Sequence, residues 1–201
     1  MAAADITRLM NNARDRLAGA TDPLMQRELF NVMDEFFKGS NVWNEDIELT
    51  VPGMDPANTI YQVTSSSPSL IDKLLWVFDK PTSTSTGRGS PVGAAMATPG
   101  ELTLASQPSS DKVYVVTVAL TVQDPALRNG YVSFPAWVLA KYRDAILDGL
   151  LGNMMSQPNK PWTNTQLSVF HMRKFKNKTA SARVEWTRNN TYRQQAWVFP
   201  G

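Results

Sequence analysis

The segment from Phe134 to Asn189 constrains the fold of this chain more than any other. Apolar residues recur at helical spacing in its first half and again in its second half, which predicts two long helices. Pro158 and Pro161 stand between the halves, and proline interrupts a helix because it lacks the backbone N–H that the helix interior needs. We therefore predict a helical hairpin with a rigid elbow. It carries much apolar surface and few residues suited to chemistry, so it is suited to packing against other protein.

Both predicted helices of this hairpin have wide apolar faces. The first opens at Pro135, and its apolar residues are Leu139, Tyr142, Ile146, Leu150 and Met154, with Val138, Leu147 and Leu151 beside them. Thr163 and Gln166 match a capping box at the start of the second. The expected apolar face of the second consists of Leu167, Phe170, Phe175, Ala182 and Trp186. Gly149 and Gly152 lower helix propensity, so we expect a close approach between helices to require them.

Two further helices are predicted before residue 44. Apolar residues at helical spacing over 3–17 predict the first, and a wider apolar stripe predicts the second. Asp22-Pro23 is expected to open the second helix, with the Asp22 carboxylate as its cap. Gly39 is expected to close it.

From Glu45 the apolar period changes to that of a strand. We predict about five or six short antiparallel strands. They lie at 45–51, 60–64, 70–78, 91–96, 102–105 and 112–122. Two of them, 70–78 and 112–122, are apolar on both faces, so helices or a neighbouring subunit should cover both sides. Residues 82–90 are rich in Ser, Thr and Gly, and their low hydrophobicity predicts a mobile loop in the free protein.

The order of these elements predicts an α+β fold that is mainly helical. Two N-terminal and two C-terminal helices would form a bundle, with an antiparallel β lobe inserted between them and an extended C-terminal tail. The expected divisions are an N-terminal helical hairpin over 1–44, the β lobe over 45–130, the C-terminal hairpin over 131–189 and the tail over 190–201.

Composition excludes several classes of protein. Of the 201 residues, 42% are hydrophobic and 19% charged, which suits a folded chain. There is no cysteine, which excludes disulfides, thiolate metal sites and cysteine nucleophiles. No apolar run approaches the roughly 18 residues of a membrane span, and the N-terminus lacks the pattern of a signal peptide. We expect synthesis in the cytoplasm and no membrane partner.

The net charge of +2 conceals an asymmetry. Residues 1–50 hold nine acids and five bases, a net of −4, whereas residues 135–201 hold three acids and ten bases, a net of +7. Most of these bases are in the last predicted helix. Its candidates for contact with DNA or with an acidic partner are Arg173, Lys174, Lys176 and Lys178. Such residues can also form no more than a solvated helix face.

Residues suited to catalysis are scarce. His171 is the only histidine, and it lies on the same stripe as Leu167 and Phe175, so we expect it to be packed and hydrogen-bonded rather than a base. No pair of carboxylates stands at a metal-ligand spacing around it. The acids of residues 34–35 and 45–48 lie at the edges of predicted elements, where carboxylates usually meet solvent. We therefore predict no catalytic, cofactor-binding or metal-binding residues.

Aromatic residues are the better candidates for function. Six tryptophans are present, of which Trp76 and Trp186 are expected in the core. Trp162, between two prolines and a helix start, and Trp197, in the tail, are expected to insert into pockets of a partner. The predicted partner interface comprises Trp162, Tyr192, Trp197, Phe199 and Arg88.

Several segments together resemble the head-to-tail adaptor (connector or neck) proteins of tailed bacteriophages, including the tail tubular protein A of short-tailed phages. The similar segments are 29–37 with Trp43, 91–92, 99–102, 118–122, 137–142, 146–149, 154–158, 161–162, 171–173 and 182–185. The resemblance covers nearly the whole chain, as a pattern of segments rather than one short motif. The loop at 82–90 fits it least.

The resemblance implies a structural protein of the virion neck or tail, assembled in the host cytoplasm. Usually about twelve identical subunits would form a ring beneath the portal protein. The ring would extend the DNA channel, through which DNA passes without sequence readout. It would also meet the next tail component, a nozzle or tail tube protein. No catalytic residues come with the family.

Two other functions remain open on the sequence. The basic last helix favours a nucleic-acid-binding module, although its aromatic residues fall on the predicted apolar stripe, which favours packing. A cell-wall hydrolase is the weaker alternative, because the acids that paired-carboxylate chemistry needs are not convincingly placed.

Overall fold

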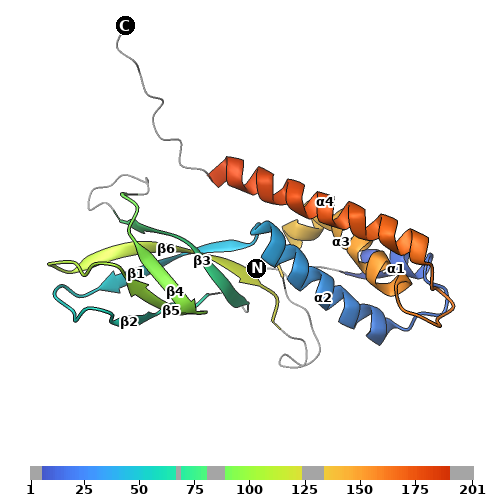
Figure 1. The fold of residues 1–201 in the computed structure, drawn as a ribbon, viewed down its shortest axis with the longest axis horizontal. Helices are drawn as coiled ribbons and strands as arrows, with labels where there is room; N and C mark the ends of the chain where they lie inside the picture. Colours follow the sequence, from blue (N-terminus) through green and yellow to red (C-terminus); the bar gives the residue numbers. More distant parts are fainter. Residues whose placement is uncertain (1–5, 67–68, 81–88, 124–133, 191–201) are drawn as a thin grey trace, which may run out of the picture.

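A computed structural model of the chain describes residues 6–66, 69–80, 89–123 and 134–190. Over these residues the chain has four helices and six strands, and the strands form two antiparallel sheets of three. In Figure 1 the helices gather toward one end of an elongated molecule and the strands toward the other. The predicted mixed α+β class is confirmed. Residues 82–88 of the predicted loop at 82–90, and residues 191–201 of the predicted tail at 190–201, lie outside the described residues.

The helices are α1 (Thr7–Arg14), α2 (Asp22–Ser40), α3 (Ala136–Met155) and α4 (Thr165–Asn190). Helices α3 and α4 pack along each other, as the predicted hairpin requires, and α2 contacts both of them. The shorter α1 packs against α3. The apolar stripe predicted for α3 is its buried face, with Val138, Ile146, Leu150, Leu151 and Met154 fully enclosed.

The first sheet has the order β1-β6-β3. Its strands are β1 (Asn44–Val51), β3 (Leu70–Asp79) and β6 (Lys112–Thr121). Central strand β6 is buried on both faces, since Val116 and Val118 on one side and Thr117 and Ala119 on the other are all fully enclosed. Helix α2 packs against β6, which meets the expectation that a strand apolar on both faces needs cover on both sides.

The second sheet has the order β2-β5-β4. Its strands are β2 (Ile60–Gln62), β4 (Ala94–Thr98) and β5 (Glu101–Leu104). A tight turn joins β4 to β5, and Gly100 adopts a φ of +88° there, which glycine tolerates at little cost. Strand β3 contacts β4 and so joins the two sheets.

Two tryptophans connect the first sheet to the helices. Trp76 of β3 stacks on Trp186 of α4, with ring centroids 5.0 Å apart and ring planes 10° apart. Trp186 is buried, as predicted, and Trp76 is half-buried. The C-terminal end of α4 is therefore held against the first sheet.

The predicted end of α2 at Gly39 is wrong. Gly39 lies inside the helix, which ends at Asn41 in the left-handed conformation, with a φ of 58°. A Cβ added at Gly39 would lie 2.8 Å from Thr179 Cγ2 of α4. The glycine therefore permits close packing of α4 rather than closing α2.

Two predicted helix caps are also wrong. The Asp22 carboxylate does not cap α2, because Arg14 Nε donates to it at 2.9 Å. At the start of α4, Asn164 Oδ1 accepts a hydrogen bond from Leu167 N at 3.0 Å, so Asn164 takes the place of the predicted capping box. Thr163 Oγ1 instead donates to Gln157 O within the elbow.

The glycines of α3 lie where neighbouring helices come closest, as predicted. A Cβ at Gly149 would lie 2.5 Å from Val32 Cγ1 of α2 and 2.9 Å from the ring of Phe175 of α4. A Cβ at Gly152 would lie 2.6 Å from Met172 Sδ. These contacts are shorter than packed carbon atoms accept, so only glycine fits without displacement of a helix or a side chain.

We expect Gly149→Ala to destabilise the fold by about 1–2 kcal/mol, because the clash with rigid neighbours exceeds the gain in helix propensity. Gly152→Ala is the matched comparison and should cost less, since Met172 is flexible and can shift its side chain. Urea unfolding of the two variants measures both effects. A Gly149→Ala protein at least as stable as the parent would contradict the inferred close approach.

Candidate interaction surface

Of the residues predicted to meet a partner, only Trp162 is among those the structure describes; Arg88, Tyr192, Trp197 and Phe199 lie outside. Trp162 is half-buried and packs against the core, with its ring beside Gly19 in the turn between α1 and α2. Its Nε1 atom is enclosed and has no hydrogen-bond partner among the described residues. The structure thus places the Trp162 ring within the subunit.

Helix α4 has two faces of different character. The inward face, which packs on α2 and α3, is buried; it carries Ser168, His171, Phe175, Ala182 and Trp186. The outward face leaves four large apolar side chains exposed. They are Leu167, 43% exposed, Val169, 65%, Phe170, 50%, and Val184, 49%.

The prediction that Leu167 and Phe170 belong to the packed face of α4 is therefore wrong. Each precedes a buried residue, Ser168 or His171, by one position, and one position is about 100° around a helix. Polar Ser168 takes the inward place because its hydroxyl donates to Gly152 O of α3 at 2.8 Å. The spacing of apolar residues does not predict that a polar residue is buried when its hydrogen bond forms only in the folded chain.

The outward face of α4 is also basic. Arg173, Lys174 and Lys176, which were predicted to meet a partner, are all exposed there, as are Arg183 and Arg188. Lys174 Nζ lies 4.5 Å from the centroid of the Phe170 ring, in a cation–π contact. The only acid from residue 165 to 188 is Glu185, whose carboxylate binds Lys141 Nζ of α3 at 2.5 Å. The positive charge of this face is therefore not balanced on α4 itself.

Two open depressions lie along α4. One of about 600 Å³ is lined by Ala180, Ser181, Val184, Glu185 and Arg188. The other, of about 370 Å³, is lined by Ser168, Val169, Met172, Arg173, Lys176 and Asn177. Each places an exposed valine beside an arginine. We define the outer face of α4 as Leu167, Val169, Phe170, Arg173, Lys174, Lys176, Asn177, Ala180, Ser181, Arg183, Val184 and Arg188.

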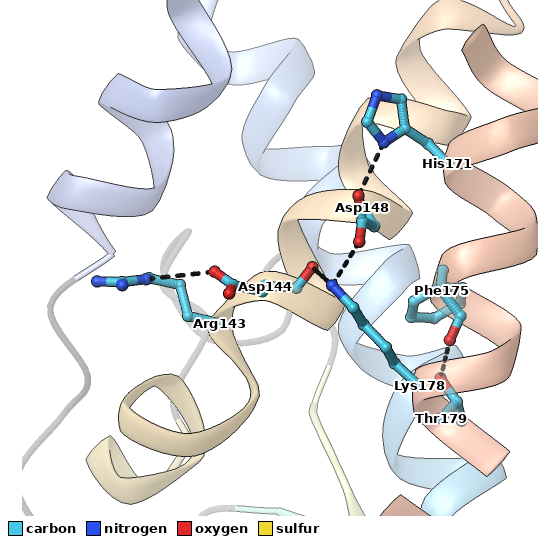
Figure 2. Close-up of polar contacts among 7 residues, drawn as sticks. All are labelled: Arg143, Asp144, Asp148, His171, Phe175, Lys178 and Thr179. Atoms are coloured by element: carbon cyan, nitrogen blue, oxygen red, sulfur yellow. Dashed lines mark hydrogen bonds and ion pairs between the residues drawn. The ribbon is translucent and has the colours of Figure 1, made fainter. Parts of the chain in front are cut away.

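Lys178, the fourth base predicted to meet a partner, is turned toward α3 (Figure 2). Its Nζ donates to Asp148 Oδ2 at 2.6 Å and to the Asp144 carbonyl oxygen at 3.1 Å. The other carboxylate oxygen of Asp148 lies 2.8 Å from His171 Nδ1. His171 is thus packed and hydrogen-bonded, as predicted. The role of Asp148 was not predicted from the sequence. An acidic residue among the apolar residues of α3 indicates that its carboxylate meets a buried hydrogen-bonding partner.

The cluster of Asp148, His171 and Lys178 joins α3 to α4. Asp148 is 8% exposed and His171 7% exposed. Burial alone would raise the pKa of the Asp148 carboxyl, but the hydrogen bonds from Lys178 and His171 outweigh it and hold this pKa below its usual value. Both carboxylate oxygens are occupied, so the cluster fixes the position of α4 on α3.

Four of the five acids considered for hydrolase chemistry, all but Glu35, have local partners. Asp34 accepts hydrogen bonds from Lys38 Nζ at 2.7 Å and Thr121 Oγ1 at 2.7 Å, and Asp46 accepts one from Thr117 Oγ1 at 2.5 Å. Ser65 Oγ donates to Glu45, and Lys80 Nζ to Glu48, each at 2.5 Å. Through these bonds Asp34 joins α2 to β6, and the other three carboxylates hold β1 to neighbouring segments of the β lobe.

No three His, Asp or Glu side chains among the described residues gather closely enough to hold a metal ion. None of their helices is both long and apolar enough to cross a bilayer.

Comparison with known proteins finds no protein-family model and no curated protein that matches this chain.

We expect Asp148→Asn to lower the free energy of unfolding by about 1–3 kcal/mol at neutral pH, because it removes the charge that Lys178 and His171 meet. Since the folded-state pKa lies below the usual 3.8, the contribution of Asp148 is fully present above that pH. It is lost as pH falls further, through the folded-state pKa. The stability difference between parent and variant should therefore shrink only below about pH 4.

Asp144→Asn is the matched control, because its side chain is 80% exposed and lies one turn away on α3. It should change stability by less than about 0.5 kcal/mol. Urea unfolding from neutral pH into the acid range measures both variants. Equal effects of the two substitutions would show that the buried cluster adds no more than an exposed charge.

Proposed function

We propose that this chain is a structural virion protein, a ring-forming head-to-tail adaptor that joins a portal to a tail and extends the DNA channel. The observation that carries the proposal is the outer face of α4, where apolar and basic side chains stand exposed together on a long helix. Apolar side chains half exposed in the free subunit favour burial against another protein. Arginine is enriched at such interfaces, which suits Arg173, Arg183 and Arg188.

The polar groups inside the subunit are consistent with a structural role. Asp148, His171 and Lys178 satisfy one another between two helices. The sequence resemblance to phage adaptor proteins involves segments from both the helices and the strands. It supports the proposal independently of the side-chain contacts described above.

In the proposed assembly the two N-terminal and two C-terminal helices act as one bundle and form the body of the ring. The β lobe over 45–130 and the tail over 190–201 would reach the neighbouring components, which are the portal protein and the nozzle or tail tube protein. Trp76 of the β lobe stacks on Trp186 of α4. The lobe is thereby linked to the helix that carries the proposed partner surface, as an assembly with contacts on both would need.

Electron microscopy of the purified chain, with and without portal rings of the same virus, tests the proposal. We expect a ring of the chain seated on one end of the portal, with a continuous central channel. A chain that never associates with the portal, at any protein concentration, would refute the adaptor function.

A nucleic-acid-binding module is the second candidate, because α4 exposes Arg173, Lys174 and Lys176 together. Its affinity for duplex DNA should then fall linearly with the logarithm of salt concentration, with a slope near −0.9 for each phosphate contacted. The exposed Val169 and Val184 favour the adaptor, because phosphate groups offer no apolar surface to cover them.

Removal of the tail gives a further test of assembly. Truncation after Thr191 deletes Trp197 and Phe199, and we expect a folded subunit that fails to join its neighbour or the portal. Loss of an aromatic side chain that fills a pocket typically costs about 2 kcal/mol or more of binding. Circular dichroism would check folding, and ultracentrifugation with portal rings would check assembly. An unfolded truncation would instead place the tail in the core, and normal assembly would show that it is dispensable.

A further inference from the structure

We propose that the loop between β1 and β2, residues 52–59, is a second docking element, in which Met54 inserts into an apolar pocket of a partner protein. In Figure 1 this β1–β2 loop lies at the end of the molecule opposite the helices. The inference rests on the proposed function, because an adaptor must bind two components and the outer face of α4 offers only one surface.

The backbone of Met54 is strained. Its φ is 64°, in the left-handed region, where a side chain is crowded by its own backbone and where glycine is accepted at lower cost. Packing does not offset this cost, because the Met54 side chain is 83% exposed, the largest exposed fraction of any large apolar side chain among the described residues. Strain that serves no packing inside the subunit points to a function outside it.

Contacts with the loop between β5 and β6 hold Met54 in this conformation. Met54 N donates to Pro108 O at 2.9 Å. Gly53 N donates to Asp111 Oδ1 at 2.9 Å. A Cβ at Gly53 would lie 2.5 Å from Ser110 Cα, so the two loops touch backbone to backbone. The position of Met54 is therefore set before any partner arrives, which lowers the entropy that binding costs.

Neighbouring residues add rigidity and apolar surface. Pro52 and Pro56 stand two positions before and after Met54, and both are exposed. Proline fixes φ, so the two rings limit the conformations that the loop can adopt. Tyr61 OH lies 2.9 Å from Asp55 Oδ2 and anchors the loop to β2. The β1–β2 loop thus presents a small apolar surface on a restrained backbone.

The charge around Met54 indicates the kind of partner. Residues 52–59 and 105–111 contain two acids, Asp55 and Asp111, and no lysine or arginine. Nucleic acids and anionic lipids attract basic surfaces, so neither suits this loop. A methionine side chain is unbranched and flexible, and it fills apolar pockets of varied shape. The partner is therefore a protein with an apolar pocket whose rim is uncharged or basic.

The two docking surfaces of the chain select different partners. The outer face of α4 is basic, so its partner would carry carboxylates. The β1–β2 loop is acidic, and carboxylates placed opposite it would repel its own acids. One partner surface cannot suit both, so we assign the two surfaces to different proteins of the assembly.

Met54→Gly tests this inference, because glycine removes the side chain and accepts the left-handed backbone. We expect the midpoint of urea unfolding to equal or exceed that of the parent, while binding to the partner weakens at least about tenfold. Met54→Leu keeps an apolar side chain and should retain most of the binding. Asn58→Gly is the matched control: Asn58 is exposed in the same loop with a φ of 65°, and its replacement should change neither quantity.

The probes are portal rings and the purified nozzle or tail tube protein of the same virus, each mixed separately with every variant and measured by sedimentation. Weaker binding of Met54→Gly to one of the two proteins, with Asn58→Gly unaffected, supports the inference. It is overturned if Met54→Gly binds both as the parent does, or if Met54→Leu or Asn58→Gly loses as much binding. A lower urea midpoint of Met54→Gly also overturns it, since the methionine would then serve the fold.

Failure of this inference differs from failure of the adaptor function. If the parent binds the portal and Met54→Gly binds equally well to both proteins, this inference fails and the adaptor function stands. If the parent binds neither protein, both fail. If Met54→Gly loses only self-association and still binds both proteins, the loop forms a contact between copies, and the assignment to a different protein is wrong.

Discussion

The close approach of α2, α3 and α4 to one another is the constraint on which the rest of this structure depends. Three glycines make it, at residues 39, 149 and 152, where any Cβ would meet a neighbouring helix at less than 3 Å. Because α4 lies directly on these contacts, its distance from α2 decides where its far end falls. That end carries Trp186, so the same contacts set whether the helices meet the sheet at Trp76.

The rotation of α4 about its axis matters as much as its distance. Apolar packing alone tolerates small rotations, since Phe175 and Ala182 can slide against similar surface. The carboxylate of Asp148 does not, because His171 and Lys178 must reach different oxygens of the same group. Buried ionic contacts often add little stability but favour one arrangement. We therefore regard this cluster as the feature that keeps Arg173, Arg183 and the exposed valines directed outward.

Sequence patterns were reliable where one local rule decides the structure. The long helices and the five or six strands follow from periodicity and proline placement, and the close approach at Gly149 and Gly152 follows from the low helix propensity of glycine. Prediction failed where a distant residue competes for a local group: Arg14 takes the Asp22 carboxylate, and Thr179 of α4 explains Gly39. The same holds for the predicted contact residues of α4: Arg173, Lys174 and Lys176 are exposed, whereas Lys178 is turned toward α3. Asp148, which redirects Lys178, is thirty positions away in sequence.

The mixed character of the outer face of α4 limits what it can bind. Exposed bases alone would suit a polyanion, and exposed apolar residues alone would suit an apolar groove of any charge. Here Val169 lies beside Arg173, and Val184 beside Arg188, in the same two depressions. A partner that covers the valines also removes water from around the arginines, and a desolvated charge without a counterion is costly. A partner of this face would therefore have to present carboxylates and apolar surface together, and a folded acidic protein surface supplies both in fixed positions.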